Sequence, residues 1–308
     1  MTELPSIALV TPNYNQAHLI RGALESVLDQ GYPNLEYVVI DGASTDGSAD
    51  AIREYSDRLH FWISEPDSGH YNAVNKGFEK TTGEIMGYLN SDDTLLPGAL
   101  GTVAEIFTRF PEIEWITGSH TAIDSQGRPV AVTLPDVWSR WHTISRKVHR
   151  FIPQESTFWR RSLWERAGGG LDEAYPLAAD YELWTRFATH AQLHTVFAPL
   201  GCFRFVEGQR SVAQRDGYWE DVERVRRKVL EAPGSARALR VADLGLTVTD
   251  VIGLRRLRRK VNRALGAPAE IVFVPEAMEF QRVADRSSGA LGRRMFRAFG
   301  GRAAGGRS

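Results

Sequence analysis

The chain has 308 residues, 43% of them hydrophobic, and its 37 Lys+Arg nearly balance its 38 Asp+Glu. This length and apolar content suffice for a large core, and the balanced charge gives no indication of a nucleic-acid partner. One cysteine excludes an internal disulfide and a cysteine zinc cluster, and the eight histidines show no ligand spacing. No segment has the pattern of a signal peptide or a membrane span, so we expect a cytoplasmic protein.

Short apolar runs alternate with segments of helical spacing along most of the chain. The strand-like runs lie at residues 7–10, 37–40, 85–89, 115–118 and 193–197. Helical spacing recurs at residues 19–28, 73–78, 100–110 and 183–187, and Asn15 is a candidate cap for the first helix. The alternation predicts an α/β fold with a mostly parallel sheet and helices on both faces.

Three of the apolar runs end in polar loops. The first ends in Thr11-Pro12-Asn13-Tyr14-Asn15, the second in the acidic, Gly-rich segment 41–48, and the third in Asn90-Ser91-Asp92-Asp93. In open α/β sheets ligands bind outside the carboxyl ends of the strands, so we expect these loops to line one crevice.

Asp92 and Asp93 place two adjacent carboxylates at the end of an apolar run. Mg²⁺ and Mn²⁺ prefer carboxylate oxygens and keep open positions for substrate phosphates, so the pair is a candidate metal–phosphate site. Turn and helix-capping chemistry uses the same residue types and remains an alternative.

Six motifs follow one another along residues 5–211. They are Thr11-Pro12-x-x-Asn15, Val39-Ile40-Asp41-Gly42-x-Ser44-x-Asp46-Gly47, Ser64-Glu65-Pro66-Asp67-x-Gly69, Asn75-Lys76-Gly77, Asn90-Ser91-Asp92-Asp93 and Asp180-Tyr181-Glu182-Leu183-Trp184. In this order they resemble the bacterial family 2 glycosyltransferases, most of all the non-processive enzymes of exopolysaccharide, O-antigen and glycolipid assembly. The resemblance implies a GT-A fold and inverting transfer of one sugar from a nucleotide-sugar donor to a glycan or lipid-linked acceptor.

The resemblance also implies roles for single residues in donor binding. Asp41 matches the aspartate that contacts the donor base, usually uracil, and Asp67 matches a second acidic donor contact. The other implied donor-binding residues are Thr11, Pro12, Asn15, Asn75, Lys76 and Asp92. The residue types alone equally allow Asp41 and Asp46 to organise a turn and Lys76 to be a solvated surface residue.

Asp92 and Asp93 match the family's aspartate signature, in which one carboxylate binds the divalent cation, Mg²⁺ or Mn²⁺, and its neighbour holds the ribose or supports the cation site, and we favour Asp92 as the ligand. Asn90 stands where many relatives have a further aspartate, so this chain offers the cation one charge fewer. Val74 stands where many relatives have an arginine, which Lys76 could replace.

Asp180 matches the catalytic base of the inverting members. A base is needed because a sugar hydroxyl is a poor nucleophile unless its proton is removed as the bond forms. A helix N-cap is the alternative role for Asp180, and core packing is the alternative to acceptor stacking for Trp184.

The charges are unevenly distributed along the chain. Residues 226–308 contain 18 Lys+Arg and 7 Asp+Glu, against 19 and 31 in residues 1–225. We therefore predict a catalytic domain at 1–225 and a basic helical extension at 226–308 with a disordered tail. The amphipathic segment 254–265 is a candidate contact with the anionic inner face of the cell membrane, or else packs on the catalytic domain.

Two other functions remain open. A catalytically inactive GT-A fold could serve as a binding or scaffold subunit. A sugar nucleotidyltransferase typically has a Gly-rich phosphate loop with Arg and Lys after its first strand, where this chain has Thr11-Pro12-Asn13-Tyr14-Asn15.

Overall fold

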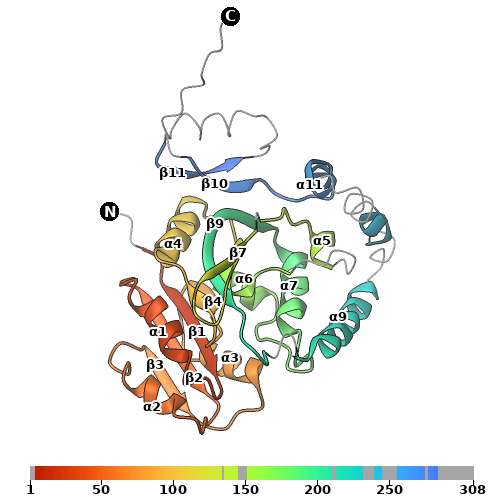
Figure 1. The fold of residues 1–308 in the computed structure, drawn as a ribbon. Helices are drawn as coiled ribbons and strands as arrows, with labels where there is room; N and C mark the ends of the chain where they lie inside the picture. The colour runs from red at the N-terminus through yellow and green to blue at the C-terminus, as the bar shows by residue number, and fades with distance from the viewer. Residues whose placement is uncertain are drawn as a thin grey trace, which may run out of the picture.

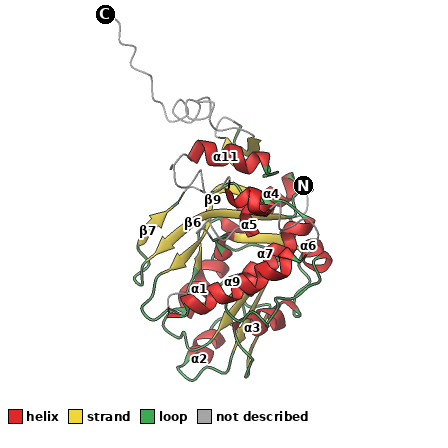
Figure 2. Cartoon of the chain, turned by 90° about the vertical axis from the view of Figure 1, so that its right-hand side faces the viewer, coloured by secondary structure: helices red, strands yellow, loops and turns green. Residues whose placement is uncertain are grey.

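The computed structural model describes residues 4–133, 135–144, 151–209, 213–231, 239–244, 255–274 and 277–283. In these residues eleven strands join in one mixed sheet, with helices on both faces (Figures 1 and 2). The strands are β1 (Ile7–Asn13), β2 (Leu35–Asp41), β3 (Phe61–Ser64), β4 (Ile85–Tyr88), β5 (Thr94–Leu95), β6 (Trp115–Ile123), β7 (Pro129–Val132), β8 (Thr157–Arg160), β9 (Leu193–Arg204), β10 (Glu270–Val274) and β11 (Glu279–Val283). The helices are α1 (Ile20–Leu28), α2 (Ser48–Arg53), α3 (His70–Phe78), α4 (Ala99–Arg109), α5 (Arg140–Ile144), the 3₁₀ turn η1 (Gln154–Ser156), α6 (Arg161–Arg166), α7 (Ala179–His190), α9 (Arg215–Leu230) and α11 (Arg255–Ala264).

The sheet has the strand order β11-β10-β9-β6-β8-β4-β1-β2-β3, with β5 paired to β9 and β7 paired to β6. The strands that run in one direction are β1, β2, β3, β4, β6, β9 and β10. The sheet is therefore mostly parallel, as predicted. Because β1 to β4 end at the same edge, the polar loops that follow them gather there.

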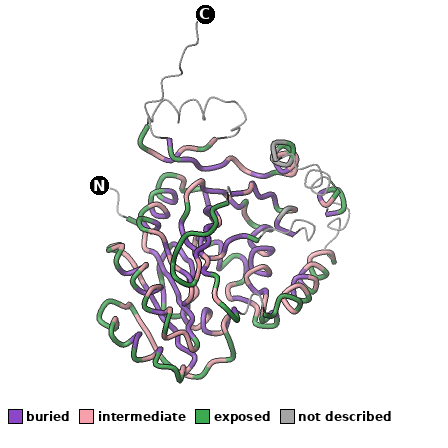
Figure 3. The backbone as a smooth tube through the Cα atoms, in the orientation of Figure 1, coloured by how far each residue is buried: buried purple, intermediate pink, exposed green. Residues whose placement is uncertain are grey.

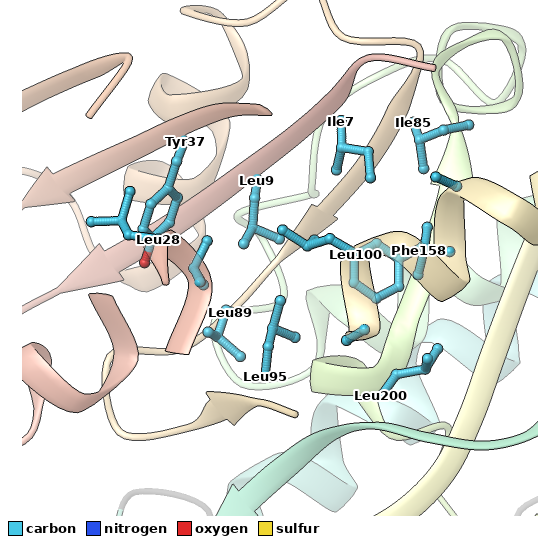
Figure 4. Close-up of a cluster of buried hydrophobic side chains, with 14 of the residues drawn as sticks. Ile7, Leu9, Leu28, Tyr37, Ile85, Leu89, Leu95, Leu100, Phe158 and Leu200 are labelled. Carbon is cyan, nitrogen blue, oxygen red and sulfur yellow. The ribbon is translucent and has the colours of Figure 1, made fainter. Parts of the chain in front are cut away.

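The strand β1 shows why the central strands are apolar at every position. Ile7 and Leu9 pack into a cluster with α1 and α4, whereas Ala8 and Val10 pack into a second cluster with α3 and α7. The central strands form the buried middle of the molecule (Figure 3), and side chains of the first cluster meet in Figure 4. A strand covered on both faces has no solvent side, so no polar alternation appears in its sequence.

The helix α1 begins at Ile20, so the predicted cap at Asn15 is wrong. The intervening residues form a turn in which the N–H groups of Leu19 and Ile20 both donate to the Gln16 carbonyl. Asn15 has a φ of 52°, in the left-handed region that Asn tolerates, and its Oδ1 accepts the Thr45 N–H at 2.9 Å. Its side chain therefore joins the loops after β1 and β2.

The basic extension is not helical throughout, because it contributes β10 and β11. β10 pairs in parallel with β9 at Ile271 and Val196, and Ile271 and Phe280 are buried in the first core cluster. The predicted boundary at residues 225 and 226 falls inside α9. The charge asymmetry therefore does not mark a break in secondary structure.

The amphipathic segment forms α11 as predicted, although Leu254 and the tail at 300–308 lie outside the described residues. Asn262 is buried and its Oδ1 accepts the Ser139 hydroxyl at 3.2 Å, whereas Leu257 is 39% exposed. The helix therefore contacts the rest of the protein through Asn262 rather than through a complete apolar stripe. In the part of the chain that the structure describes, no helix is long and apolar enough to cross a membrane.

Two helical glycines test how tightly α3 packs on the sheet. A Cβ on Gly77 would overlap Cγ1 of Val10 on β1, whereas a Cβ on Gly22 in α1 meets nothing within 4 Å. We expect Gly77→Ala to lower the free energy of unfolding by about 1–3 kcal/mol, because overpacking displaces the core. Gly22→Ala should raise it by up to ~1 kcal/mol through its better helix propensity. Urea denaturation measures both, and variants of equal stability would contradict this packing.

Candidate active site

Asp41, at the end of β2, is fully buried and accepts four hydrogen bonds. Its Oδ1 accepts from Asn13 Nδ2 at 2.6 Å and from the Ser44 hydroxyl at 2.5 Å. Its Oδ2 accepts from the Ser44 N–H at 3.0 Å and from the Ser64 hydroxyl at 2.6 Å. A carboxylate has about four acceptor positions, so this one is saturated and ties together the ends of β1, β2 and β3.

Further hydrogen bonds connect the loops after β1 and β2. The Asn15 N–H donates to the Ser44 hydroxyl at 2.8 Å, and Asp46 accepts from the N–H groups of Ala17 at 2.8 Å and Ser48 at 3.0 Å. Asp46 therefore organises the turn, which was the alternative interpretation of this part of the motif.

Asp67 lies against the loop after β2, as a donor-site residue should. It is partly exposed and accepts the Gly69 N–H at 2.8 Å. A Cβ on Gly42 would lie 2.8 Å from Asp67 Oδ2 and 3.3 Å from the Tyr14 ring, so only glycine allows this approach. The structure thus brings together the loops after β1, β2 and β3.

Thr11 and Pro12 face the interior of the protein. The Thr11 side chain is fully buried, and its hydroxyl lies 2.9 Å from the Tyr37 hydroxyl. Pro12 is buried in β1 opposite Ile40. Their side chains support the sheet, and their contact with a donor stays a prediction.

Asn75 and Lys76 are engaged with neighbouring loops. The Asn75 amide donates to the Leu171 carbonyl at 2.9 Å and accepts the Leu171 N–H at 2.8 Å. The Lys76 ammonium pairs with Glu65 at 2.8 Å and donates to the Pro66 carbonyl at 3.2 Å. Lys76 would have to exchange partners to reach a diphosphate.

Asp92 and Asp93 differ in their surroundings. Asp93 is 1% exposed and accepts from the Arg204 N–H at 2.9 Å and from Asn90 Nδ2 at 3.1 Å. Asp92 is partly exposed, and its carboxylate accepts one long hydrogen bond, 3.4 Å from Gln209 Nε2. Arg204 also donates from Nε to the Asp92 carbonyl at 2.8 Å, so it holds the Asp93 carboxylate and the Asp92 backbone.

Burial raises the pKa of both carboxylates. The pKa of Asp93 lies well above its usual range because the charges of Asp92 and Glu155 add to the effect of burial. Two close carboxylates resist simultaneous ionisation, and a cation relieves that repulsion.

The residues present fit a divalent cation of the kind that binds together with phosphate. Among the described residues no group of three or more His, Cys, Asp or Glu could form a closed metal cage. Mg²⁺ bound with a nucleotide needs only one or two carboxylates, because phosphate oxygens and water complete its shell. Asp92 fits this role, whereas both carboxylate oxygens of Asp93 are already engaged.

Asp180 lies in the first turn of α7, but Ala178 occupies the N-cap, so the capping interpretation is wrong. Asp180 Oδ1 accepts the Tyr181 N–H at 2.8 Å and the Tyr71 hydroxyl at 3.2 Å. Burial raises the pKa of Asp180, and these two hydrogen bonds oppose the rise. A carboxylate whose pKa moves toward neutrality is a stronger base.

Trp184 belongs to the core. It is 2% exposed and stacks on Trp115 with the ring centroids 5.7 Å apart. The core interpretation of this residue is therefore confirmed.

Tyr88, the last residue of β4, is buried. Burial, then the charge of Asp180 and, more weakly, that of Asp93, raise the pKa of Tyr88. The His70 ring lies 4.9 Å from the Tyr71 ring and 6.1 Å from the Tyr88 ring. The charges of Asp180 and of Asp93 therefore both act on the Tyr88 phenol.

The sequence analysis missed several residues that hold these carboxylates in place. They are Ser64, Tyr71, Tyr88 and Gln209, and the contacts of Arg204 were not predicted. Tyr71 is 109 residues from Asp180, and Arg204 is 111 residues from Asp93, so no local spacing could have indicated these pairs.

The chain was compared with models of protein families. A family model described as Glycosyl transferase family 2 matches residues 8–163, and the chain belongs to this family. TuaG of Bacillus subtilis (strain 168), whose name places it in teichuronic acid biosynthesis, is 37% identical over 92 residues, 29% of this chain and 36% of TuaG. The chain spans about a third of the length of TuaG and of other glycosyltransferase relatives that it matches.

Solved structures share the fold. S. aureus TarS 1–349 in complex with UDP-GlcNAc superposes with a TM-score of 0.62 at 16% identity, over 84% of this chain and 80% of that one. The mannosyltransferase PcManGT from Pyrobaculum calidifontis, in complex with GDP-Man and Mn²⁺, superposes with a TM-score of 0.58 at 20% identity, over 86% of this chain and 77% of that one. The predicted GT-A-type α/β fold is therefore confirmed.

The hydrogen bonds of Asp41 and Asp67 predict different costs on removal. Asp41→Ala removes the acceptor of four hydrogen bonds, one buried and three partly buried, and should lower the free energy of unfolding by at least ~3 kcal/mol. Asp67→Ala removes one hydrogen bond from a partly exposed residue and should cost under ~1 kcal/mol. Urea denaturation of both variants measures the difference, and an equally small loss in Asp41→Ala would show that the network is not structural.

Proposed function

We propose that this chain is a metal-assisted, inverting glycosyltransferase. It moves one sugar from a nucleotide-diphosphate sugar, a UDP-sugar first among the candidates, to a hydroxyl of a glycan or lipid-linked acceptor. The observation that carries the proposal is the difference in exposure and hydrogen bonding among four carboxylates. Asp41 and Asp93 are buried and accept hydrogen bonds with both carboxylate oxygens, whereas Asp92 and Asp180 are partly exposed and each accepts, from the described residues, through one oxygen.

The donor would lie across the loops after β1, β2 and β3 and reach β4 with its diphosphate. Asp67, which lies against Gly42, is a partly exposed part of these loops, and Asp92 would hold the cation. The cation, when bound, neutralises the charge that develops on the departing nucleoside diphosphate.

Asp180 would act on the acceptor. Its carboxylate takes the proton of the acceptor hydroxyl while the hydroxyl oxygen attacks the anomeric carbon of the donor sugar. The bond from that carbon to the diphosphate oxygen breaks, and the electron pair leaves with the nucleoside diphosphate. Attack on the face opposite the leaving group inverts the anomeric configuration. The raised pKa of Asp180 favours this step, because it makes the carboxylate a stronger base.

The relatives support the class of substrate. TuaG is named for teichuronic acid biosynthesis, TarS is described with UDP-GlcNAc and PcManGT with GDP-Man and Mn²⁺. We accordingly propose a cell-envelope or exopolysaccharide glycan as product, with UDP-sugars and GDP-mannose as the donors to assay. Donor hydrolysis in such an assay would exclude an inactive scaffold role.

We propose further that the protein works in the cytoplasm, on the inner face of the cell membrane. The helix α11 supports this, because it lies in a strongly basic part of the chain and leaves Leu257 and Lys260 exposed. Each basic residue near an anionic membrane contributes on the order of 1 kcal/mol to binding.

Vesicle flotation tests the membrane proposal. We expect the full chain to float with phosphatidylglycerol vesicles at low salt, and the double variant Leu257→Asp, Lys260→Glu to float less. Lys228→Glu, a charge reversal at an exposed lysine of α9, is the matched control. If all three proteins float equally, or if none of them floats, the proposal is contradicted.

Asp92→Ala tests the cation site. We expect UDP to bind the wild type more tightly with Mn²⁺ than without, and the variant to lose at least about tenfold in affinity together with this dependence. Asp50→Ala, at an exposed carboxylate of α2, should behave as wild type. Calorimetric titration measures the affinities, and an unchanged Mn²⁺ response in Asp92→Ala would refute the assignment.

Asp180→Asn tests the base. It keeps the size of the side chain but cannot take a proton at neutral pH, so transfer should fall by ~10²- to 10⁴-fold. UDP affinity should stay at the wild-type value, because Asp180 lies on the acceptor side of the proposed site. Transfer by the variant within about threefold of wild type would refute the catalytic role.

The pH profile provides the companion measurement. Transfer should fall as the pH drops below the raised pKa of Asp180, because the protonated carboxyl accepts no proton. The Tyr71 hydroxyl stabilises the charged form, so Tyr71→Phe raises that pKa further and should move the acid limb of kcat/KM to higher pH. An unmoved limb, or one that moves to lower pH, would argue against Asp180 as the titrating base.

A further inference from the structure

Three aromatic side chains gather at the amino end of α9. The Phe151 ring lies 5.5 Å from the Tyr218 ring and 5.9 Å from the Trp219 ring, measured between centroids. Phe151 precedes η1 in the chain and is 58% exposed. Tyr218 and Trp219 lie outside residues 8–163, the part that matches the family model, so the family match assigns them no role.

The amino end of α9 is attached to the segment that leads into Asp180. The Leu177 N–H donates to Asp221 Oδ2 at 3.0 Å, and a Cβ on Gly217 would lie 2.8 Å from Leu177 Cδ1. The Leu177 carbonyl lies 3.4 Å from the Tyr71 hydroxyl, which also donates to Asp180 at 3.2 Å. The helices α7 and α9 lie side by side in both views (Figures 1 and 2). The aromatic cluster is therefore next to the proposed base.

Tyr218 connects the cluster electrostatically with the base. Burial raises the pKa of Tyr218 well above its usual range, and the charge of Asp180 adds to this effect. The phenol therefore keeps its proton and can donate a hydrogen bond to a ligand on the cluster.

This combination suits one class of ligand. The C–H face of a pyranose is apolar and packs on aromatic rings, while its hydroxyl groups need hydrogen-bond donors and acceptors at the rim. Here the exposed Phe151 ring supplies the apolar face, and the Tyr218 phenol lies beside it. The donor loops after β1, β2 and β3 form a separate part of the site, so this surface is available to the acceptor.

We propose that Phe151, Tyr218 and Trp219 form the acceptor subsite and that the acceptor presents a pyranose ring to it. The hydroxyl that receives the sugar then belongs to a saccharide rather than to a polyol phosphate. The inference rests on the proposed function and specifies its second substrate.

Saturation-transfer NMR on the full chain tests the subsite without requiring turnover. The probes are methyl pyranosides of glucose, galactose, mannose, rhamnose and N-acetylglucosamine, each with and without UDP and Mn²⁺. We expect at least one glycoside to bind the wild type through its ring C–H protons, and Phe151→Ala to weaken that binding by about five- to tenfold. Phe151→Tyr should retain binding, and Phe273→Ala, at another partly exposed phenylalanine, is the matched control.

The outcomes separate the subsite from the function on which it rests. If no glycoside binds the wild type, or if Phe151→Ala binds as wild type does, the subsite is wrong. If sn-glycerol 3-phosphate binds in a Phe151-dependent way and no glycoside does, the acceptor class is wrong. A UDP titration of the same samples reports on the donor site, so a failure of the proposed function appears there and not in the glycoside measurements.

Discussion

The hydrogen bonds that the Asp41 carboxylate accepts are the interactions on which the loops after β1, β2 and β3 depend. Parallel strands end at one edge of the sheet, and this edge brings polar loops and acidic side chains close together. A buried carboxylate is tolerated only when its oxygens are fully bonded. Asp41 meets that condition with donors from β1, from its own loop and from β3, and in doing so fixes the relative positions of the three loops.

The same constraint explains the division of roles among the other carboxylates. Asp93 is as buried as Asp41 and is held by the Arg204 backbone, so it stabilises the loop after β4. Its neighbour Asp92 is partly exposed, and its carboxylate accepts one long hydrogen bond, from Gln209. Asp180 keeps two hydrogen bonds and a raised pKa. Buried carboxylates that accept hydrogen bonds with both oxygens thus differ from partly exposed ones that accept through one oxygen, which residue type alone does not reveal.

The sequence predicted the parts of the fold that depend on local pattern. The apolar runs that became β1, β2 and β4 are buried on both faces, and the polar residues that follow them mark where each strand ends. The motif order indicated Asp41, Asp67, Asp92 and Asp180 as site residues, and their roles stay predictions. The role of Asn15 was predicted wrongly because an Asn that caps a helix and an Asn that joins two loops have the same sequence signature.

Long-range pairing could not be predicted from spacing. Arg204 reaches Asp93 across 111 residues, and β10 joins β9 although a long basic stretch separates the two strands. In the extension, the density of Arg and Lys favoured a helical prediction and obscured the short apolar run of β10. Thr11 lies in a functional motif, yet its hydroxyl faces Tyr37 because β1 is covered on both sides.

A crystal structure of the complex with UDP and Mn²⁺ tests the central claim most directly, namely that Asp92 is the reactive member of the pair and Asp93 the structural one. The account predicts a cation bound by the Asp92 carboxylate and the diphosphate oxygens, with Asp93 still accepting the Arg204 N–H. A cation bound by Asp93 in place of Asp92, or an Asp93 carboxylate released from Arg204, would contradict it.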